Sequence, residues 1–94
     1  MIKSFRDKET ENIFHSKRIK KINAKLVKKV KRRLDFLNDA VDIEDMYFPP
    51  SNKFHSLDGF KPTRYAIWVD NKWRITFEWD TGNAYNVIFE DYHR

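Results

Sequence analysis

The spacing of apolar residues changes once along this 94-residue chain, and that change constrains its fold more than any other feature. Between residues 23 and 39, apolar side chains recur every three or four positions and so share one helical face: Leu26, Val27, Val30, Leu34 and Leu37. From residue 53 onward, apolar residues alternate with polar ones, as they do in half-buried strands. This order predicts an α+β domain in which helices cover one face of an antiparallel sheet.

Cap and turn residues delimit the predicted elements. Asp7 and Asn23 are predicted N-caps of two helices, the first of which is short and ends near residues 15–16. Residues 42–52 contain two consecutive prolines and are predicted to form a loop. Residues 70–72 and 80–83 are predicted to form tight hairpin turns.

The alternating segments predict the strands. They are residues 2–5, before the helices, and residues 53–57, 64–69, 73–79 and 84–90 after them. In the last segment we expect Tyr85, Val87 and Phe89 to share a face. The predicted arrangement is a single domain over residues 1–94, with an antiparallel sheet and both helices packed on one of its faces. Its order is β-α-α-β-β-β, in which the last three strands are the sequential, hairpin-linked ones and residues 53–57 are a further segment that can form a strand.

Positive charge is concentrated early in the chain. Residues 1–40 carry 13 Lys/Arg and 5 Asp/Glu, whereas residues 41–94 carry 6 and 9. Residues 17–33 hold ten basic residues and no acidic one, so we expect this surface to attract polyanions such as RNA. The alternatives are a solvated helix face and a membrane-surface helix, but the apolar face of residues 23–39 contains no Trp.

Several classes of function lack the residues they require. The chain has no Cys, which excludes disulfides, thiol catalysis and Cys-based zinc sites. We expect no cofactor and no metal, because the three His are far apart and no Gly-rich phosphate loop is present; Glu90-Asp91 is only a weak Mg²⁺ candidate. No apolar run has the length of a membrane span and no secretion signal is visible, so we expect a cytoplasmic protein with no membrane partner.

Candidate catalytic residues lie mainly at the end of the chain, where Glu90, Asp91, Tyr92, His93 and Arg94 follow the last predicted strand. RNA cleavage uses the ribose 2′-OH as nucleophile and needs a proton acceptor, a proton donor and cations near the phosphate. His, Tyr and Arg side chains supply these groups without a metal. The alternatives are a solvated terminal tail, a purely structural His55, and an Arg74 that forms a surface ion pair with Glu78 or a neighbouring acid.

Five segments, in order along nearly the whole chain, resemble the HigB toxins of bacterial toxin–antitoxin modules, within the RelE/ParE superfamily. They are residues 1–5 (MIKSF), 43–46 (IEDM), 54–59 (FHSLDG), 71–77 (NKWRITF) and 90–93 (EDYH). The resemblance implies a RelE-like fold and a ribosome-dependent endoribonuclease that cuts mRNA in the ribosomal A site. It also implies two kinds of partner, a HigA-type helix-turn-helix antitoxin and the ribosome with its mRNA.

The resemblance also implies site residues. The catalytic set is His55, Asp91, Tyr92 and His93, with Arg74 at the scissile phosphate. The residues expected to bind RNA or the ribosome are Lys25, Lys28, Lys29, Lys31, Arg32, Arg33, Arg64 and Trp68. Asp58 and Trp68 depart from the family pattern, because many relatives carry a basic residue at each position; Trp68 offers base stacking instead.

Two other functions remain open at this point. A toxin of the same fold that inhibits DNA gyrase would not depend on His93. A non-catalytic module that binds RNA or the ribosome would need the basic helix but not the terminal cluster.

Overall fold

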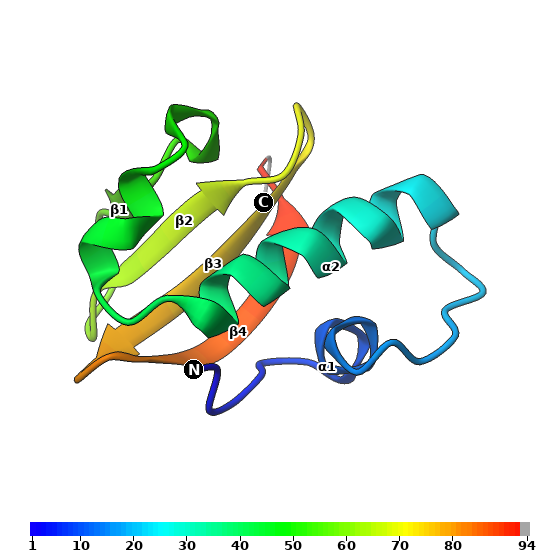
Figure 1. Cartoon of the computed structure of the whole chain (residues 1–94), viewed down its shortest axis with the longest axis horizontal. Helices are drawn as coiled ribbons and strands as arrows, with labels where there is room; N and C mark the ends of the chain where they lie inside the picture. The colour runs from blue at the N-terminus through cyan, green and yellow to red at the C-terminus, as the bar shows by residue number, and fades with distance from the viewer. Residues whose placement is uncertain (93–94) are drawn as a thin grey trace.

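The computed structural model describes residues 1–92, which form two α-helices and a four-stranded sheet (Figure 1). The helices are α1 (Lys8–Phe14) and α2 (Ala24–Asp39), followed by two 3-10 turns, η1 (Ile43–Tyr47) and η2 (Pro50–Asn52). The strands are β1 (His55–Leu57), β2 (Arg64–Trp68), β3 (Trp73–Asp80) and β4 (Asn83–Asp91). The segment 42–52, predicted as a loop, therefore contains two short helical turns, and the first of them is closed by a capping box between Asp42 and Asp45.

Both predicted helix starts are confirmed. The Asp7 carboxylate accepts the backbone N–H of Thr10 at 2.9 Å, and α1 ends at His15, before Ser16 adopts a positive φ of 59°. The Asn23 side chain accepts the N–H groups of the first turn of α2, including that of Lys25 at 2.8 Å. These side chains satisfy N–H groups that have no partner within the helix.

The sheet has the order β1-β2-β3-β4, and every neighbouring pair is antiparallel. The predicted first strand at residues 2–5 is wrong. This segment makes only two isolated bridges to β4, in parallel orientation, between Ile2 and Ala84 and between Phe5 and Val87. Between the two bridges, the N–H of Asn86 donates to Ser4 Oγ at 2.8 Å and Asn86 has a positive φ, so the two bridges are not joined into one regular ladder.

A β-bulge shifts the register between β3 and β4. Glu78 pairs with Tyr85, but Thr76 pairs with Ile88, so one extra residue lies in β4 between these pairs. Asn86 occupies this stretch with a positive φ of 51°. The prediction that Tyr85 shares a face with Val87 and Phe89 is wrong for this reason.

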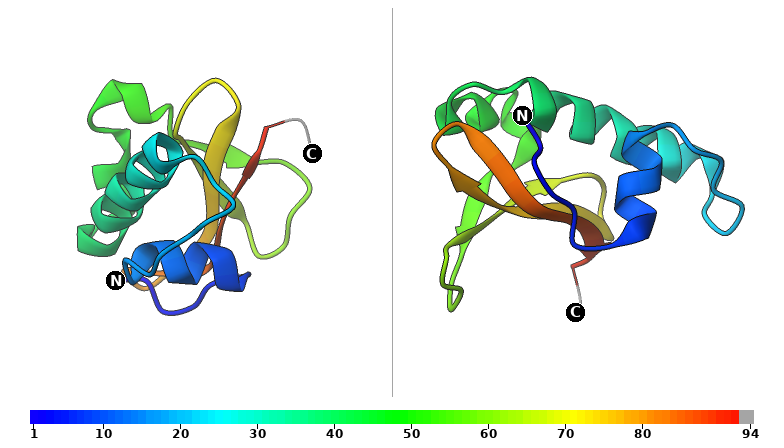
Figure 2. Two further views of the ribbon diagram at one scale, coloured as in Figure 1. Left: turned by 90° about the vertical axis from the view of Figure 1, so that its right-hand side faces the viewer. Right: turned by 90° about the horizontal axis from the view of Figure 1, so that it is seen from below.

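The core lies between the helices and one face of the sheet (Figure 2). The apolar face of α2 is fully buried at Val30, Leu34 and Leu37 against alternate residues of the strands, such as Ile75 and Phe77. Both helices thus cover the same face, as predicted. Among the described residues, no helix combines the length and the apolar character needed to cross a bilayer.

Candidate active site

The sheet face opposite α2 carries most of the candidate catalytic side chains. In the strand registers, His55 lies opposite Ala66, Trp68 lies opposite Arg74, and Arg74 lies opposite Glu90. The residues between them in each strand belong to the core, so these side chains project away from the helices. The same face therefore brings an imidazole, an indole and a guanidinium from three different strands together.

An open pocket of about 470 Å³ lies at one end of this face, lined by Lys53, His55, Trp68, Asn71 and Tyr92. Lys53 Nζ stands 4.7 Å from the centre of the Trp68 ring, in a cation–π arrangement. Lys53 therefore places a positive charge where the family pattern predicts a basic residue at position 68. Cations beside exposed aromatic rings are the features that single-stranded nucleic acids bind.

The imidazole of His55 is oriented by its own backbone neighbour. His55 Nδ1 lies 2.8 Å from the carbonyl oxygen of Lys53, which can only accept a hydrogen bond. Nδ1 therefore carries the hydrogen, and in the neutral ring Nε2 carries the lone pair. A neutral His55 in this tautomer is equipped to accept a proton at Nε2.

The guanidinium of Arg74 is held between a carboxylate and an aromatic ring. Its Nη2 donates to Glu90 Oε2 at 3.1 Å, and its Cζ lies 5.2 Å from the centre of the Tyr92 ring. The Arg74 side chain is 14% exposed, and its Nε has no hydrogen-bond partner among residues 1–92. The arrangement fixes the plane of the guanidinium while leaving part of its donor capacity unused.

Tyr92 is anchored through its backbone and keeps its proton at neutral pH. Its N–H donates to the carbonyl oxygen of Lys72 at 2.8 Å. Burial raises the pKa of the Tyr92 hydroxyl above its usual value, and the Arg74 charge opposes this only in part. The phenol therefore remains a hydrogen-bond donor suited to a phosphoryl oxygen.

Asp91 is separated from this cluster by the alternation of β4. It lies opposite Trp73, and its carboxylate is 3.9 Å from Lys72 Nζ, which itself stands 5.3 Å from the centre of the Trp73 ring. Glu90, not Asp91, is the carboxylate that contacts Arg74. Of the predicted catalytic set, His55, Arg74 and Tyr92 share one sheet face, Asp91 is grouped with Trp73, and His93 lies outside the described residues.

The predicted basic surface on α2 divides into exposed and engaged side chains. Lys25, Lys28, Lys29 and Arg32 are exposed. Lys31 pairs with Asp35 at 2.7 Å, and the guanidinium of Arg33 donates to the buried side chain of Asn52. Burial lowers the pKa of Arg33, and the neighbouring charge of Arg32 adds a smaller effect in the same direction. The exposed positive charge therefore comes from the other four residues.

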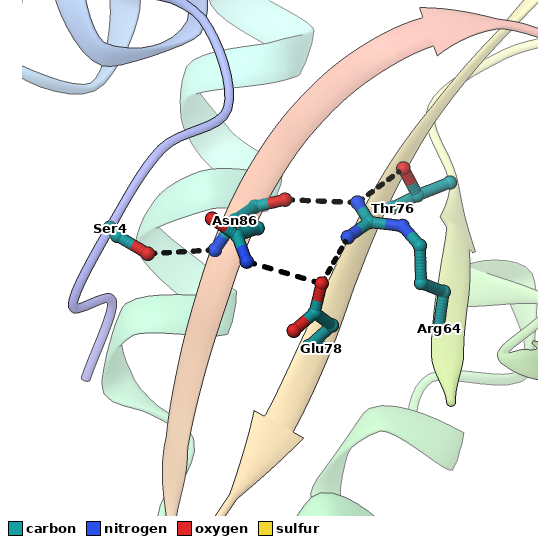
Figure 3. A network of polar contacts seen from close by, with 5 residues as sticks. All are labelled: Ser4, Arg64, Thr76, Glu78 and Asn86. Carbon is teal, nitrogen blue, oxygen red and sulfur yellow. Dashed lines mark hydrogen bonds and ion pairs between the residues drawn. The ribbon is translucent and has the colours of Figure 1, made fainter. Parts of the chain in front are cut away.

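Arg64 was predicted to bind RNA, but its side chain is only 5% exposed. Its guanidinium donates to Glu78 at 3.1 Å, to Thr76 at 3.0 Å and to the carbonyl oxygen of Asn86 at 2.9 Å (Figure 3). Arg64 thus links β2 to β3 and to the bulge of β4, with little of its guanidinium accessible to a ligand.

Sequence reasoning missed Lys53 and Asn71 at this site, and it named Glu90 in the terminal cluster without identifying it as the partner of Arg74. Lys53 had a detectable signal, because it precedes His55 by two positions and period 2 places both on one side of the chain. The contact of Glu90 with Arg74 had no such signal, because without the bulge Arg74 would face Phe89. The bulge turns Glu90 toward Arg74.

An antiparallel four-stranded sheet with helices on one face and a His, Tyr and Arg cluster on the other is the arrangement expected of a RelE-like toxin. The family model for the RelE-like toxin of the type II toxin–antitoxin system HigB matches residues 3–93. The chain belongs to this HigB-like toxin family, as the sequence motifs predicted.

Two curated relatives are similar over almost their whole length. "Endoribonuclease HigB" of Proteus vulgaris is 33% identical over 93 residues, which cover 99% of this chain and 100% of the relative. "Toxin HigB-1" of Vibrio cholerae serotype O1 is 30% identical over 91 residues, which cover 96% of each chain.

Proposed function

We propose that the chain is an endoribonuclease that cuts mRNA in the A site of the translating ribosome, as the toxin of a type II toxin–antitoxin module. Membership of the HigB-like family and the name of the Proteus vulgaris relative support the endoribonuclease activity. The observation that carries the proposal is the pocket that joins His55, Tyr92, Trp68 and Lys53, with Arg74 stacked on Tyr92. Action on translating ribosomes would place the protein in the cytoplasm.

The proposed reaction is a metal-independent transesterification. A histidine accepts the proton of the ribose 2′-OH, the 2′-oxygen attacks the adjacent phosphorus, and the bond to the 5′-oxygen breaks as that oxygen takes up a proton from an acid. His55, Asp91 and His93 are the candidates for base and acid. Arg74 and the Tyr92 hydroxyl would stabilise the charge on the phosphoryl oxygens.

Ribosome dependence is supported by the openness of the pocket. Within residues 1–92, the pocket is bounded by the sheet face and is open on the opposite side. The protein alone therefore has few groups that could hold a flexible RNA strand in line for attack. Helix α2 covers the opposite face of the sheet, and its exposed cations would meet ribosomal RNA; they are Lys25, Lys28, Lys29 and Arg32. The ribosome would thus position both toxin and message. The neutralising partner we propose is a HigA-type antitoxin.

The test uses wild type, His55→Ala and His15→Ala on programmed ribosomes and on the same message without ribosomes. His15 is a matched control because it is also exposed but packs against Phe5 and Phe14, outside the pocket. We expect wild type and His15→Ala to cut only ribosome-bound message, inside the A-site codon, and His55→Ala to lose at least 100-fold in rate, in line with the loss of a general base of about 10²–10⁴.

Two outcomes would contradict the proposal. Rapid cleavage of the free message would remove ribosome dependence. Growth arrest by the expressed protein, equal in wild type and His55→Ala and without new mRNA 5′ ends, would instead favour inhibition of gyrase or simple occupation of the ribosome.

A further inference from the structure

A second pocket, of about 370 Å³, lies beside the β1–β2 loop and the start of β2. Its lining includes Arg6 from the N-terminal segment, Phe60 and Lys61 from the loop, and the buried pair Arg64 and Glu78. Sequence reasoning gave no role to Arg6, Phe60 or Lys61.

This second pocket shares a sheet face with the candidate active site. Arg64 is the first residue of β2 and Trp68 is the last, and an even number of positions separates them, so both project from the same face. At about 3.3 Å per residue, the two ends of β2 are about 13 Å apart. A single strand of RNA that passes the active site can follow this face to the second pocket.

The second pocket carries an excess of positive charge. Arg64 is neutralised by Glu78 at 3.1 Å, but the exposed side chains of Arg6 and Lys61 form no ion pair with a carboxylate among residues 1–92. The charge of Arg6 also contributes, after burial, to a lowered pKa of Arg64, so the two guanidinium groups repel each other. A bound anion would relieve this repulsion.

An exposed aromatic ring completes the arrangement. Phe60 is 46% exposed, lines the pocket, and is adjacent in sequence to Lys61. A ring beside two uncompensated cations provides both features that a nucleotide of single-stranded RNA requires: a surface on which its base stacks and a charge for its phosphate.

We propose that this pocket is a second nucleotide subsite, in which Phe60 stacks on a base of the mRNA downstream of the cut codon and Arg6 and Lys61 bind its phosphate. The inference rests on the proposed function, since it assumes that the substrate is a message on the ribosome. The subsite takes no part in bond cleavage, so its loss raises KM and leaves kcat unchanged. Arg64 lines the pocket, but its guanidinium is bound by Glu78, Thr76 and the Asn86 carbonyl.

The test compares two messages on programmed ribosomes, one that ends directly after the A-site codon and one that extends six nucleotides further. With the extended message, Phe60→Ala and Lys61→Gln are expected to raise KM about 5-fold or more without a change in kcat. With the truncated message, wild type is expected to show the same raised KM as the variants. Phe60→Trp is expected to retain the wild-type KM, because it keeps a stacking surface.

Matched controls come from exposed residues that do not line the pocket. Phe48 is 70% exposed beside η1, and Lys8 is an exposed residue of α1, so Phe48→Ala and Lys8→Gln should leave KM unchanged. Because Phe60 and Lys61 are exposed, their variants should fold, which urea unfolding verifies.

Three results would overturn the subsite. The first is an unchanged KM in Phe60→Ala and Lys61→Gln. The second is a KM that remains higher in the variants than in wild type when the message is truncated, which would assign the pocket to ribosomal RNA. The third is an equal rise in the control variants. Failure of the proposed function gives a different result. Either wild type cuts neither message, or His55→Ala cuts both messages as well as wild type does.

Discussion

Arg64 and Arg74 lie on neighbouring strands of one sheet face, and each faces a glutamate on the next strand, yet their surroundings differ. The guanidinium of Arg64 donates to Glu78, to Thr76 and to the Asn86 carbonyl, and its side chain is 5% exposed. The guanidinium of Arg74 donates to Glu90, stacks on Tyr92, and has no partner for Nε within residues 1–92. Within residues 1–92, the guanidinium of Arg64 makes three hydrogen bonds to protein acceptors, whereas that of Arg74 makes one.

The difference in hydrogen bonding distinguishes two roles for an arginine on this sheet face. A buried arginine that makes three hydrogen bonds to neighbouring strands holds the strands together, and its removal leaves its carboxylate partner without a cation. An arginine whose plane is fixed by one carboxylate and one aromatic ring keeps more of its terminal N–H groups for a phosphoryl group. The ion pair alone does not distinguish the two, because both have the same 3.1 Å contact.

The largest expected effect is on catalysis at Arg74. Arg74→Met keeps the length of the side chain but removes the charge at the phosphate, so kcat on programmed ribosomes should fall about 10²–10³-fold. Single-turnover cleavage measures the change, with the urea unfolding midpoint as a check on folding. Wild-type kcat in this variant would mean that Arg74 is as structural as Arg64.

The corresponding change at Arg64 should affect stability. Arg64→Met leaves Glu78 partly buried without its cation, and we expect the free energy of unfolding to fall by about 3 kcal/mol. Urea unfolding measures it, and the double variant Arg64→Met/Glu78→Gln should recover part of the loss because the unpaired charge is gone. A fall of less than about 0.5 kcal/mol would show that the network of Figure 3 contributes little.

Glu90 tests whether orientation of Arg74 matters beyond its charge. Glu90→Gln keeps an acceptor but replaces a charge-assisted hydrogen bond with a weaker one, so kcat should fall about tenfold with little change in KM. Asp91→Asn is the comparison, because the family resemblance assigns the catalytic carboxylate to Asp91, whereas the structure places Glu90 against Arg74. An unchanged kcat in Glu90→Gln, with a large loss in Asp91→Asn, would favour the assignment from the resemblance.

Features that depend on neighbouring residues were predictable from the sequence. The N-caps at Asp7 and Asn23, the extent of α2 and the two hairpin turns follow from local periodicity and side-chain chemistry, and all are confirmed. His55 and Arg74 were also found, through the resemblance and the residue types that RNA cleavage needs; their catalytic roles remain a prediction.

Features that depend on distant pairing were not predictable. The sequence around Asn86 contains no signal for a bulge, yet the register shift at the bulge places Glu90 rather than Phe89 opposite Arg74. The segment 2–5 alternates like a strand but lacks regular pairing, because the irregular stretch of β4 at Asn86 separates its two bridges. Charge alone placed Arg64 and Arg33 on an RNA-binding surface, whereas tertiary contacts with Glu78 and Asn52 engage them inside the protein.

The smallest expected effect concerns the ionisation of Tyr92, which belongs to the Arg74 end of the face. Because burial raises its pKa in the folded state, the unfolded chain ionises first as the pH rises past about 10, and stability falls over that range. Tyr92→Phe should remove this part of the alkaline loss and leave no ionisation effect at neutral pH. Since Arg74 lowers the pKa of Tyr92, Arg74→Met should shift the Tyr92 absorbance titration, taken as the difference from the matching Tyr92→Phe variant, to higher pH. An unchanged titration, or a shift to lower pH, would mean that the Arg74 charge does not lower the pKa of this phenol, and the contrast between the two arginines would then rest on hydrogen bonds alone.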